Sequence, residues 1–113
     1  MNAVQVQLAN ERLLVALCAQ ITKDFGLENF DLSGILPNET AFNQLYLAIY
    51  PVVQNLEKNN RSKLNYIINR VDISERQISS ALQHSQNKEY ASHLTELIIK
   101  RELQKVVIRF QNS

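Results

Sequence analysis

The last long stretch of the sequence, residues 87–110, has apolar side chains on two sides rather than one. It contains neither glycine nor proline over about six helical turns, which predicts one uninterrupted helix. At 100° per residue, its apolar side chains fall on two opposite faces. One face carries Tyr90, Leu94, Leu97, Ile98 and Ile108, and the other carries Ile99, Leu103, Val106 and Phe110. Such a helix must be covered twice, either by its own chain or by a second copy.

The earlier stretches also show helical periodicity. Apolar residues recurring every three or four positions predict a first helix that starts within residues 3–10 and ends just before Gly26, which supplies a left-handed stop. Residues 27–38 interrupt the pattern and predict an apolar loop that packs against the helices. The next periodic stretch begins between residues 38 and 40 and keeps its phase through Pro51. This continuity favours one kinked helix over two separate ones.

Two short helices are predicted next, within residues 62–84. The spacing of Ser74 and Gln77 is that of a capping box, in which each residue bonds an amide of the other. A joint at residues 84–87 then leads to the long last helix. Two glycines and two prolines are too few for the many turns of a β-sandwich or barrel. The pattern therefore predicts an all-α fold with residues 1–113 as a single domain: a small bundle of about five helices, with a long C-terminal helix and a short helical corner.

Composition narrows the class of protein. The apolar content of 45% is that of globular chains. The longest uninterrupted apolar run covers the seven residues from Leu13 to Ala19, far short of the roughly 18 needed for a membrane span. No basic residues precede an apolar segment at the N-terminus, so no secretory signal is predicted. The single cysteine lies in an apolar stripe, which favours a buried thiol over a reactive one. These features predict a cytoplasmic protein without a membrane partner.

Charge is distributed unevenly along the chain. Residues 1–57 hold two basic and six acidic side chains, whereas residues 58–113 hold ten basic and five acidic ones. Such asymmetry occurs in nucleic-acid-binding proteins, but it also arises when two halves of a fold, or two copies in a dimer, face each other. We favour the second explanation.

The stretch LNYIINRVDISERQISSALQHS, residues 64–85, is the most specific motif. It resembles the helix-turn-helix units of bacterial repressors, in which a short helix, a turn with a serine cap and a second helix pack at a steep angle. Two residues depart from that motif: Ile68 stands where the helices usually touch through a small residue, and Asp72 stands where the turn usually has glycine. The resemblance implies DNA binding as the alternative function. Its implied contact residues are Arg76, Gln77, Ser80, Gln83 and Arg70.

Patterns for metal binding and catalysis are weaker. Glu89, His93 and Glu96 share one helix face, but metal-binding bundles draw Glu-x-x-His motifs from several helices, and this sequence has none. Neither a glycine-rich phosphate loop nor a Gly-x-Ser-x-Gly turn occurs. A small enzyme or a metal-binding bundle is therefore the least favoured class. No cofactor, metal ligand or catalytic residue is predicted.

The favoured function is self-association, with a second copy or another protein as the partner. Burial of apolar surface would drive it. The predicted interface consists of Ile99, Leu103, Val106 and Phe110 on the last helix, with Val4, Leu8 and Val15 as a possible second patch on the first. A glutamate at Ile99 or Val106 is predicted either to produce a monomer or to unfold the chain.

Overall fold

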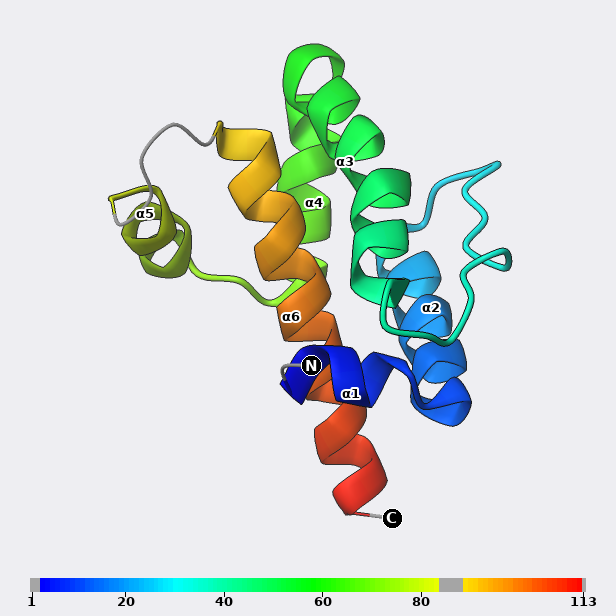
Figure 1. Cartoon of the computed structure of the whole chain (residues 1–113). Coiled ribbons are helices and arrows are strands. Elements are labelled where there is room, and N and C mark those ends of the chain that lie inside the picture. The colour runs from blue at the N-terminus through cyan, green and yellow to red at the C-terminus, as the bar shows by residue number, and fades with distance from the viewer. Residues whose placement is uncertain (1–2, 84–88, 113) are drawn as a thin grey trace.

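The structure, a computed structural model, describes residues 3–83 and 89–112. In these ranges the chain is all-helical, as predicted, with a long C-terminal helix and a short helical corner (Figure 1). The described helices are α1 (Ala3–Leu8), α2 (Glu11–Phe25), α3 (Ala41–Asn59), α4 (Arg61–Val71), α5 (Glu75–Gln83) and α6 (Tyr90–Gln111). The predicted joint at residues 84–87 lies outside the described ranges.

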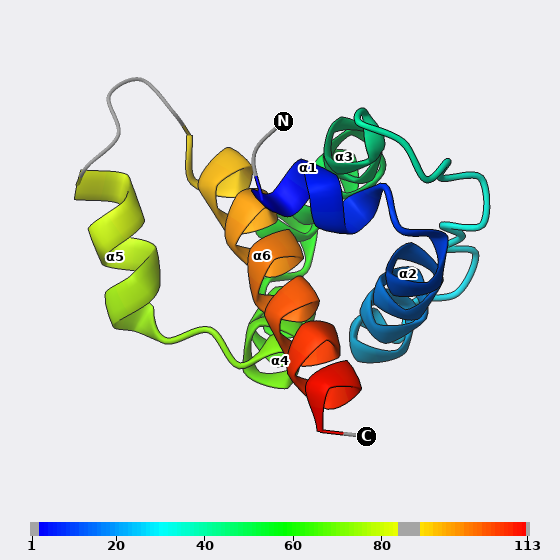
Figure 2. The ribbon, with the colours of Figure 1, turned by 60° about the horizontal axis from the view of Figure 1, so that its bottom comes forward.

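Helix α6 is the central element of the fold. Helices α2, α3, α4 and α5 all pack against it (Figure 1). Helix α4 also packs against α2 and α3, and α1 lies across α2 and α3. Of the described helices, α5 packs directly only against α6, and Figure 2 shows it standing to one side of the bundle. The long C-terminal helix is thus largely enclosed by its own chain, with Lys100, Gln104, Ile108 and Arg109 left exposed.

Both apolar faces of α6 are covered within the chain. Leu94 and Ile98 are fully buried on one face, and Ile99 and Val106 are fully buried on the other. Leu103 is also buried there, so three of the residues predicted to face a second copy instead face the chain's own core. The prediction that both apolar faces of this helix are shielded from water is therefore confirmed. The predicted interface on this helix is wrong, because α2, α3, α4 and α5 pack against α6 and bury Ile99, Leu103 and Val106 within the chain.

The predicted first helix is in fact two helices, and Asn10 separates them. Its backbone is extended, with φ −81° and ψ 114°, and its Oδ1 accepts hydrogen bonds from the amides of Arg12 at 3.0 Å and Leu13 at 3.3 Å. An asparagine N-cap satisfies amides that the first turn of a helix leaves unpaired. The turn before it lets α1 bury Leu8, which the wheel of a continuous helix places away from the core. The predicted stop at Gly26 is confirmed, with φ 57°.

Removing this cap is expected to weaken the fold measurably. Asn10→Ala leaves two helical amides without their acceptor and should lower the free energy of unfolding by about 1 kcal/mol. Asn10→Asp keeps an acceptor at the same place and should retain most of the stability. Urea denaturation followed by circular dichroism measures both changes. Equal stability of Asn10→Ala and the wild type would contradict the capping role.

The loop between α2 and α3 packs against the helices, as predicted. Leu32 is buried, and the Phe30 ring stacks on Phe25 with 5.0 Å between ring centroids. The side-chain amide of Gln44 in α3 holds the far end of the loop by two hydrogen bonds with the backbone of Leu36. Its Oε1 accepts the Leu36 amide at 2.9 Å, and its Nε2 donates to the Leu36 carbonyl at 3.4 Å. The loop is therefore a fixed wall beside α2.

Helix α3 continues through Pro51, as its apolar phase predicted. Proline removes the amide that would bond the carbonyl of Leu47. Both residues lie on the exposed side of α3, where water can solvate that carbonyl. The proline is thus tolerated because the carbonyl that it leaves unpaired faces solvent.

In the described helices, no segment combines the length and apolarity that crossing a bilayer requires.

The predicted capping box of α5 is confirmed. The Ser74 amide donates to Gln77 Oε1 at 2.9 Å, and the Gln77 amide donates to Ser74 Oγ at 3.1 Å. Asp72 ends α4 in the left-handed conformation, with φ 72°. Arg101 of α6 compensates for that unfavourable conformation by pairing with the Asp72 carboxylate at 3.0 Å and by donating to its carbonyl at 3.3 Å. An aspartate thus fills the turn position where glycine is usual.

Candidate functional site

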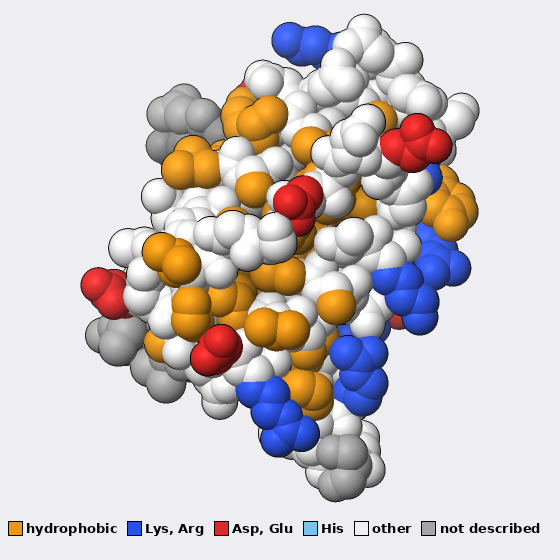
Figure 3. Space-filling model, turned by 90° about the vertical axis from the view of Figure 1, so that its right-hand side faces the viewer, with side chains coloured by type: hydrophobic (Ala, Val, Ile, Leu, Met, Phe, Trp, Pro, Cys, Tyr) orange, Lys and Arg blue, Asp and Glu red, His pale blue; other side chains and the backbone are white. Residues whose placement is uncertain are grey.

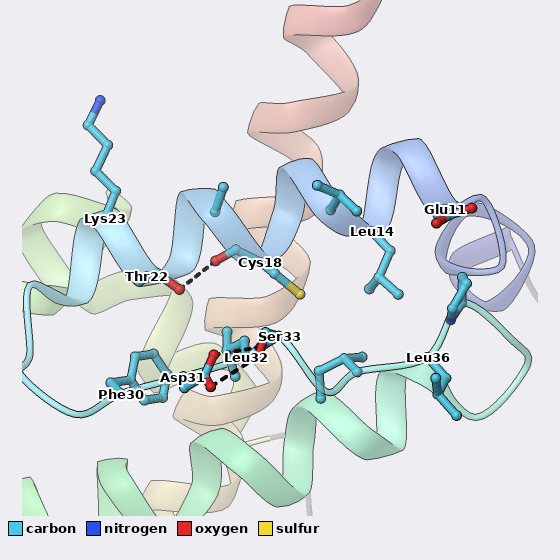
Figure 4. A pocket seen from close by; sticks show the side chains of 14 residues that line it. Glu11, Leu14, Cys18, Thr22, Lys23, Phe30, Asp31, Leu32, Ser33 and Leu36 are labelled. Atoms are coloured by element: carbon cyan, nitrogen blue, oxygen red, sulfur yellow. Dashed lines mark hydrogen bonds between the residues drawn. The ribbon is translucent and has the colours of Figure 1, made fainter.

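An apolar groove lies between α2 and the loop that follows it (Figure 4). Its volume is about 770 Å³. Most of its lining is apolar and includes Leu14, Val15, Ala19, Phe30, Leu32 and Leu36. Polar residues, Glu11, Asp31 and Lys23 among them, also line it. A groove of this composition is suited to an apolar partner rather than to a charged substrate.

The groove arises because α2 buries only one of its sides. Leu14, Leu17 and Ile21 face the core, whereas Val15 on the opposite side is 63% exposed. Leu36, on the loop that walls the groove, is 60% exposed. Figure 3 views this side of the molecule and shows hydrophobic side chains gathered across it. Contiguous exposed apolar surface is a common mark of an interaction site.

An exposed ridge runs along α2 beside the groove. It consists of Glu11, Val15, Ala19 and Lys23, which follow one another at intervals of four residues and are all exposed. We call these four residues the α2 ridge. Its order is acidic, apolar, small and basic. In the part of the chain that the structure describes, neither Glu11 nor Lys23 has an ion-pair partner.

Cys18 lines the groove with its thiol directed toward the loop (Figure 4). Burial raises the pKa of this thiol to about 11. The thiol is therefore protonated near neutral pH and is a poor nucleophile. The predicted unreactive cysteine agrees with this pKa, although the side chain is half-buried rather than buried. The groove thus offers apolar contact and no activated nucleophile at Cys18.

A second site is a cluster of buried charges where α2, α4 and α6 meet. The carboxyls of Asp24 and Glu102 are both buried. Lys105 Nζ lies 2.9 Å from Asp24 Oδ2 and 2.6 Å from Glu102 Oε1. Arg70 Nη2 approaches Asp24 Oδ1 at 3.5 Å. We call these four residues the buried charge cluster, although the Arg70 side chain itself is exposed.

Burial affects the two carboxyls of this cluster differently. It raises the pKa of Glu102 to about 8, and the adjacent Asp24 carboxyl adds to that rise. For Asp24, burial also acts to raise the pKa, but hydrogen bonds from Glu102, Lys105 and Gln20 outweigh it and lower the pKa. The pair therefore consists of one ionised and one protonated carboxyl near neutral pH. Sequence reasoning missed this pair, because the helical wheel places Glu102 on a charged flank and does not show that α2 and α4 meet α6 there.

The remaining predicted interface residues are placed as follows. Val4 and Phe110 are half-buried, and Leu8 is fully buried. The Arg12 guanidinium lies over the Phe110 ring, 4.9 Å from its centroid. Val15 is thus the one exposed residue of the predicted interface set.

The residues implied by the helix-turn-helix resemblance are not brought together as that motif requires. Helices α4 and α5 do not pack directly against each other in the described chain, and a largely polar groove of about 630 Å³ lies between them. Gln77 is committed to its cap, and Arg70 pairs with Asp24. Arg76, Ser80 and Gln83 are exposed on α5. The corner is therefore an open helical pair rather than the steeply packed unit that reads DNA.

The weak metal pattern on α6 is also dispersed. His93 is buried, whereas Glu89 is exposed at the start of the helix. Within the described ranges, no group of three histidine, cysteine, aspartate or glutamate side chains could hold a metal ion.

The chain matches no protein-family model, no curated protein and no solved structure with which it was compared.

Proposed function

We propose that this protein is a self-association module that forms a homodimer through the α2 ridge and the adjoining groove. The observation that carries the proposal is the charge order of the ridge, which complements itself when a second ridge runs antiparallel. The proposal keeps the expected cytoplasmic location, with the lone cysteine as its support.

A two-fold axis through the middle of the ridge would bring complementary side chains together. Glu11 would then face Lys23 of the second copy, and Lys23 would face its Glu11, because both lie six residues from the midpoint. Val15 would face Ala19 of the second copy, and the small alanine leaves room for the larger valine. Two-fold dimers use the same patch on both copies, so one self-complementary ridge is sufficient.

The apolar groove supplies the driving force in this arrangement. Exposed ion pairs contribute only about 0–1 kcal/mol, so the pairs between Glu11 and Lys23 chiefly set the direction of the helices. Val15 and Leu36 are the large apolar side chains that this face exposes, and their burial favours association. Stable interfaces usually bury more than about 1,000 Å². Because this face offers only two large exposed apolar side chains, we expect a weak dimer.

Sedimentation equilibrium tests the proposal directly. Wild-type protein should show a monomer–dimer equilibrium at or below about 100 μM. Val15→Glu should raise the dimer dissociation constant by about tenfold or more, because it buries two new carboxylates near the axis. Leu47→Glu is the matched control: Leu47 is 62% exposed on α3 and belongs neither to the ridge nor to the groove lining, so its substitution should leave the equilibrium unchanged.

Charge reversal tests the antiparallel direction. Glu11→Lys should weaken the dimer through like charges, and the double change Glu11→Lys with Lys23→Glu should restore it. All of these positions are exposed in the monomer, so circular dichroism should report folded variants. A wild-type chain that remains monomeric at about 100 μM refutes the proposal. If the charge variants leave the dimer dissociation constant unchanged but Val15→Glu raises it, only the antiparallel geometry is refuted.

A further inference from the structure

The buried charge cluster has an unusual distribution of hydrogen-bond donors. The Lys105 ammonium has three N–H groups. Asp24 Oδ2 lies 2.9 Å from its Nζ, and the carbonyl oxygens of Arg70 and Val71 lie at 3.3 and 3.4 Å. Glu102 Oε1 is a fourth acceptor, 2.6 Å from the same Nζ, so four oxygens compete for three hydrogens. In the described chain, no donor other than Lys105 reaches the carboxyl oxygens of Glu102.

A charged Glu102 would therefore be dehydrated and would have to share the single Lys105 ammonium with Asp24. Its side chain is 0% exposed, so water does not reach it. The neighbouring Asp24 carboxylate is ionised and repels a second negative charge. A proton on Glu102 removes this conflict, because the resulting O–H can donate to the Asp24 carboxylate. One proton thus satisfies two buried carboxyls at once.

The other charged groups around the cluster are balanced against Asp24 rather than Glu102. From α4, Arg70 pairs with Asp24 Oδ1 at 3.5 Å. From α2, the uncharged Gln20 donates to Asp24 Oδ2 at 2.9 Å and accepts from Arg109 of α6 at 2.9 Å. In the described chain, α3 and α5 bring no charged group into contact with Glu102. Lys105 is therefore the only cation beside Glu102 in this part of the molecule.

We propose that Asp24, Glu102 and Lys105 form a proton-controlled latch between α2 and α6, closed while Glu102 is protonated and loosened when it ionises. The latch joins the helix that carries the exposed ridge to the central helix of the fold. It does not depend on dimerisation, because every group in it belongs to one chain. Its direction is opposite to that of an ordinary carboxylate pair, which weakens when acid is added.

The pH window follows from the two states of Glu102. The folded environment raises the pKa of Glu102 from an ordinary 4.5 to about 8. Between these values the folded chain holds a proton that the unfolded chain has released, so stability falls as pH rises. The stabilising contribution is complete below about pH 4.5 and lost as pH passes about 8. Asp24 and Lys105 titrate outside this window, since the pKa of Asp24 is lowered and the pKa of Lys105 is raised.

Glu102→Gln tests the latch because glutamine copies the protonated acid. Its amide can donate to Asp24 but cannot ionise. Urea denaturation of the wild type and the variant at pH 5 and pH 9 gives four unfolding constants. The ratio of wild-type to variant unfolding constants should increase by about a hundredfold or more from pH 5 to pH 9. The histidines contribute equally to both proteins and cancel in this ratio.

A measurement on the wild type alone guards against a variant that fails to fold. With carboxyl-¹³C-labelled glutamate, the Glu102 resonance, assigned by triple-resonance NMR, should titrate near pH 8 in the folded protein. A Glu102 midpoint near 4.5, its ordinary pKa, would overturn the proposal. An unfolding-constant ratio that stays the same at both pH values would also overturn it.

Discussion

Replacing Ile99 with glutamate is expected to unfold the protein. Ile99 is fully buried on α6, among the residues that four other helices cover. A carboxylate there would lose its water without gaining a partner, and burial of an unpaired charge costs at least several kcal/mol. Native domains have only about 5–15 kcal/mol of total stability. Circular dichroism and urea denaturation should show a largely unfolded chain at neutral pH.

Ile108→Glu is the matched control on the same helix. Ile108 is 46% exposed, and the same change there should alter the free energy of unfolding by no more than about 0.5 kcal/mol. The sequence alone predicts either a monomer or an unfolded chain for Ile99→Glu, and the burial of Ile99 distinguishes the two outcomes. A variant with glutamate at Ile99 that stays folded but loses its partner would contradict the enclosure of α6 by its own chain.

Replacing Lys105 with methionine is expected to have the second largest effect. Methionine keeps much of the aliphatic volume but removes the ammonium that serves Asp24 and two carbonyls at the end of α4. Asp24 would keep Gln20 and the more distant Arg70 as its partners. Removing one partner of a buried ion pair typically costs about 3–5 kcal/mol, and the partial exposure of Lys105 places the expected loss near the lower end, about 3 kcal/mol.

Urea is the appropriate denaturant for this measurement, since guanidinium chloride would itself screen the charges. Lys100→Met is the matched control, because Lys100 is exposed on the same helix and should change stability by less than about 0.5 kcal/mol. Equal effects of the two substitutions would show that Lys105 stabilises nothing through its charge.

Local chemistry made several elements of the fold predictable. Gly26 ends α2, and Ser74 with Gln77 caps α5, because each signal acts within a few residues of itself. The break at Asn10 was missed, although its cause is equally local. The apolar residues before it lie off the stripe of α2, and that change of phase is the signal for a second helix. A prediction from apolar periodicity alone therefore treats α1 and α2 as one helix, because it does not consider Asn10 as an N-cap.

The candidate sites were less predictable because they depend on tertiary arrangement. Periodicity showed that Ile99 and Val106 avoid water, but it cannot distinguish cover by the same chain from cover by another copy. Val15 was selected because it lies opposite the core stripe, and the structure does leave it exposed. The pairing of Asp24 with Glu102 joins residues far apart in the chain. No local pattern predicts such a contact, since it requires α2 and α6 to be placed first.

The central position of α6 has a consequence for synthesis on the ribosome. Four helices pack against α6, yet it is the last of the described helices to emerge during translation. A nascent chain that ends before Tyr90 leaves uncovered those apolar sides of α2, α3 and α4 that α6 covers in the finished fold. Completion of the core must therefore wait until the final segment leaves the exit tunnel. During that interval the growing polypeptide presents the kind of surface that chaperones bind.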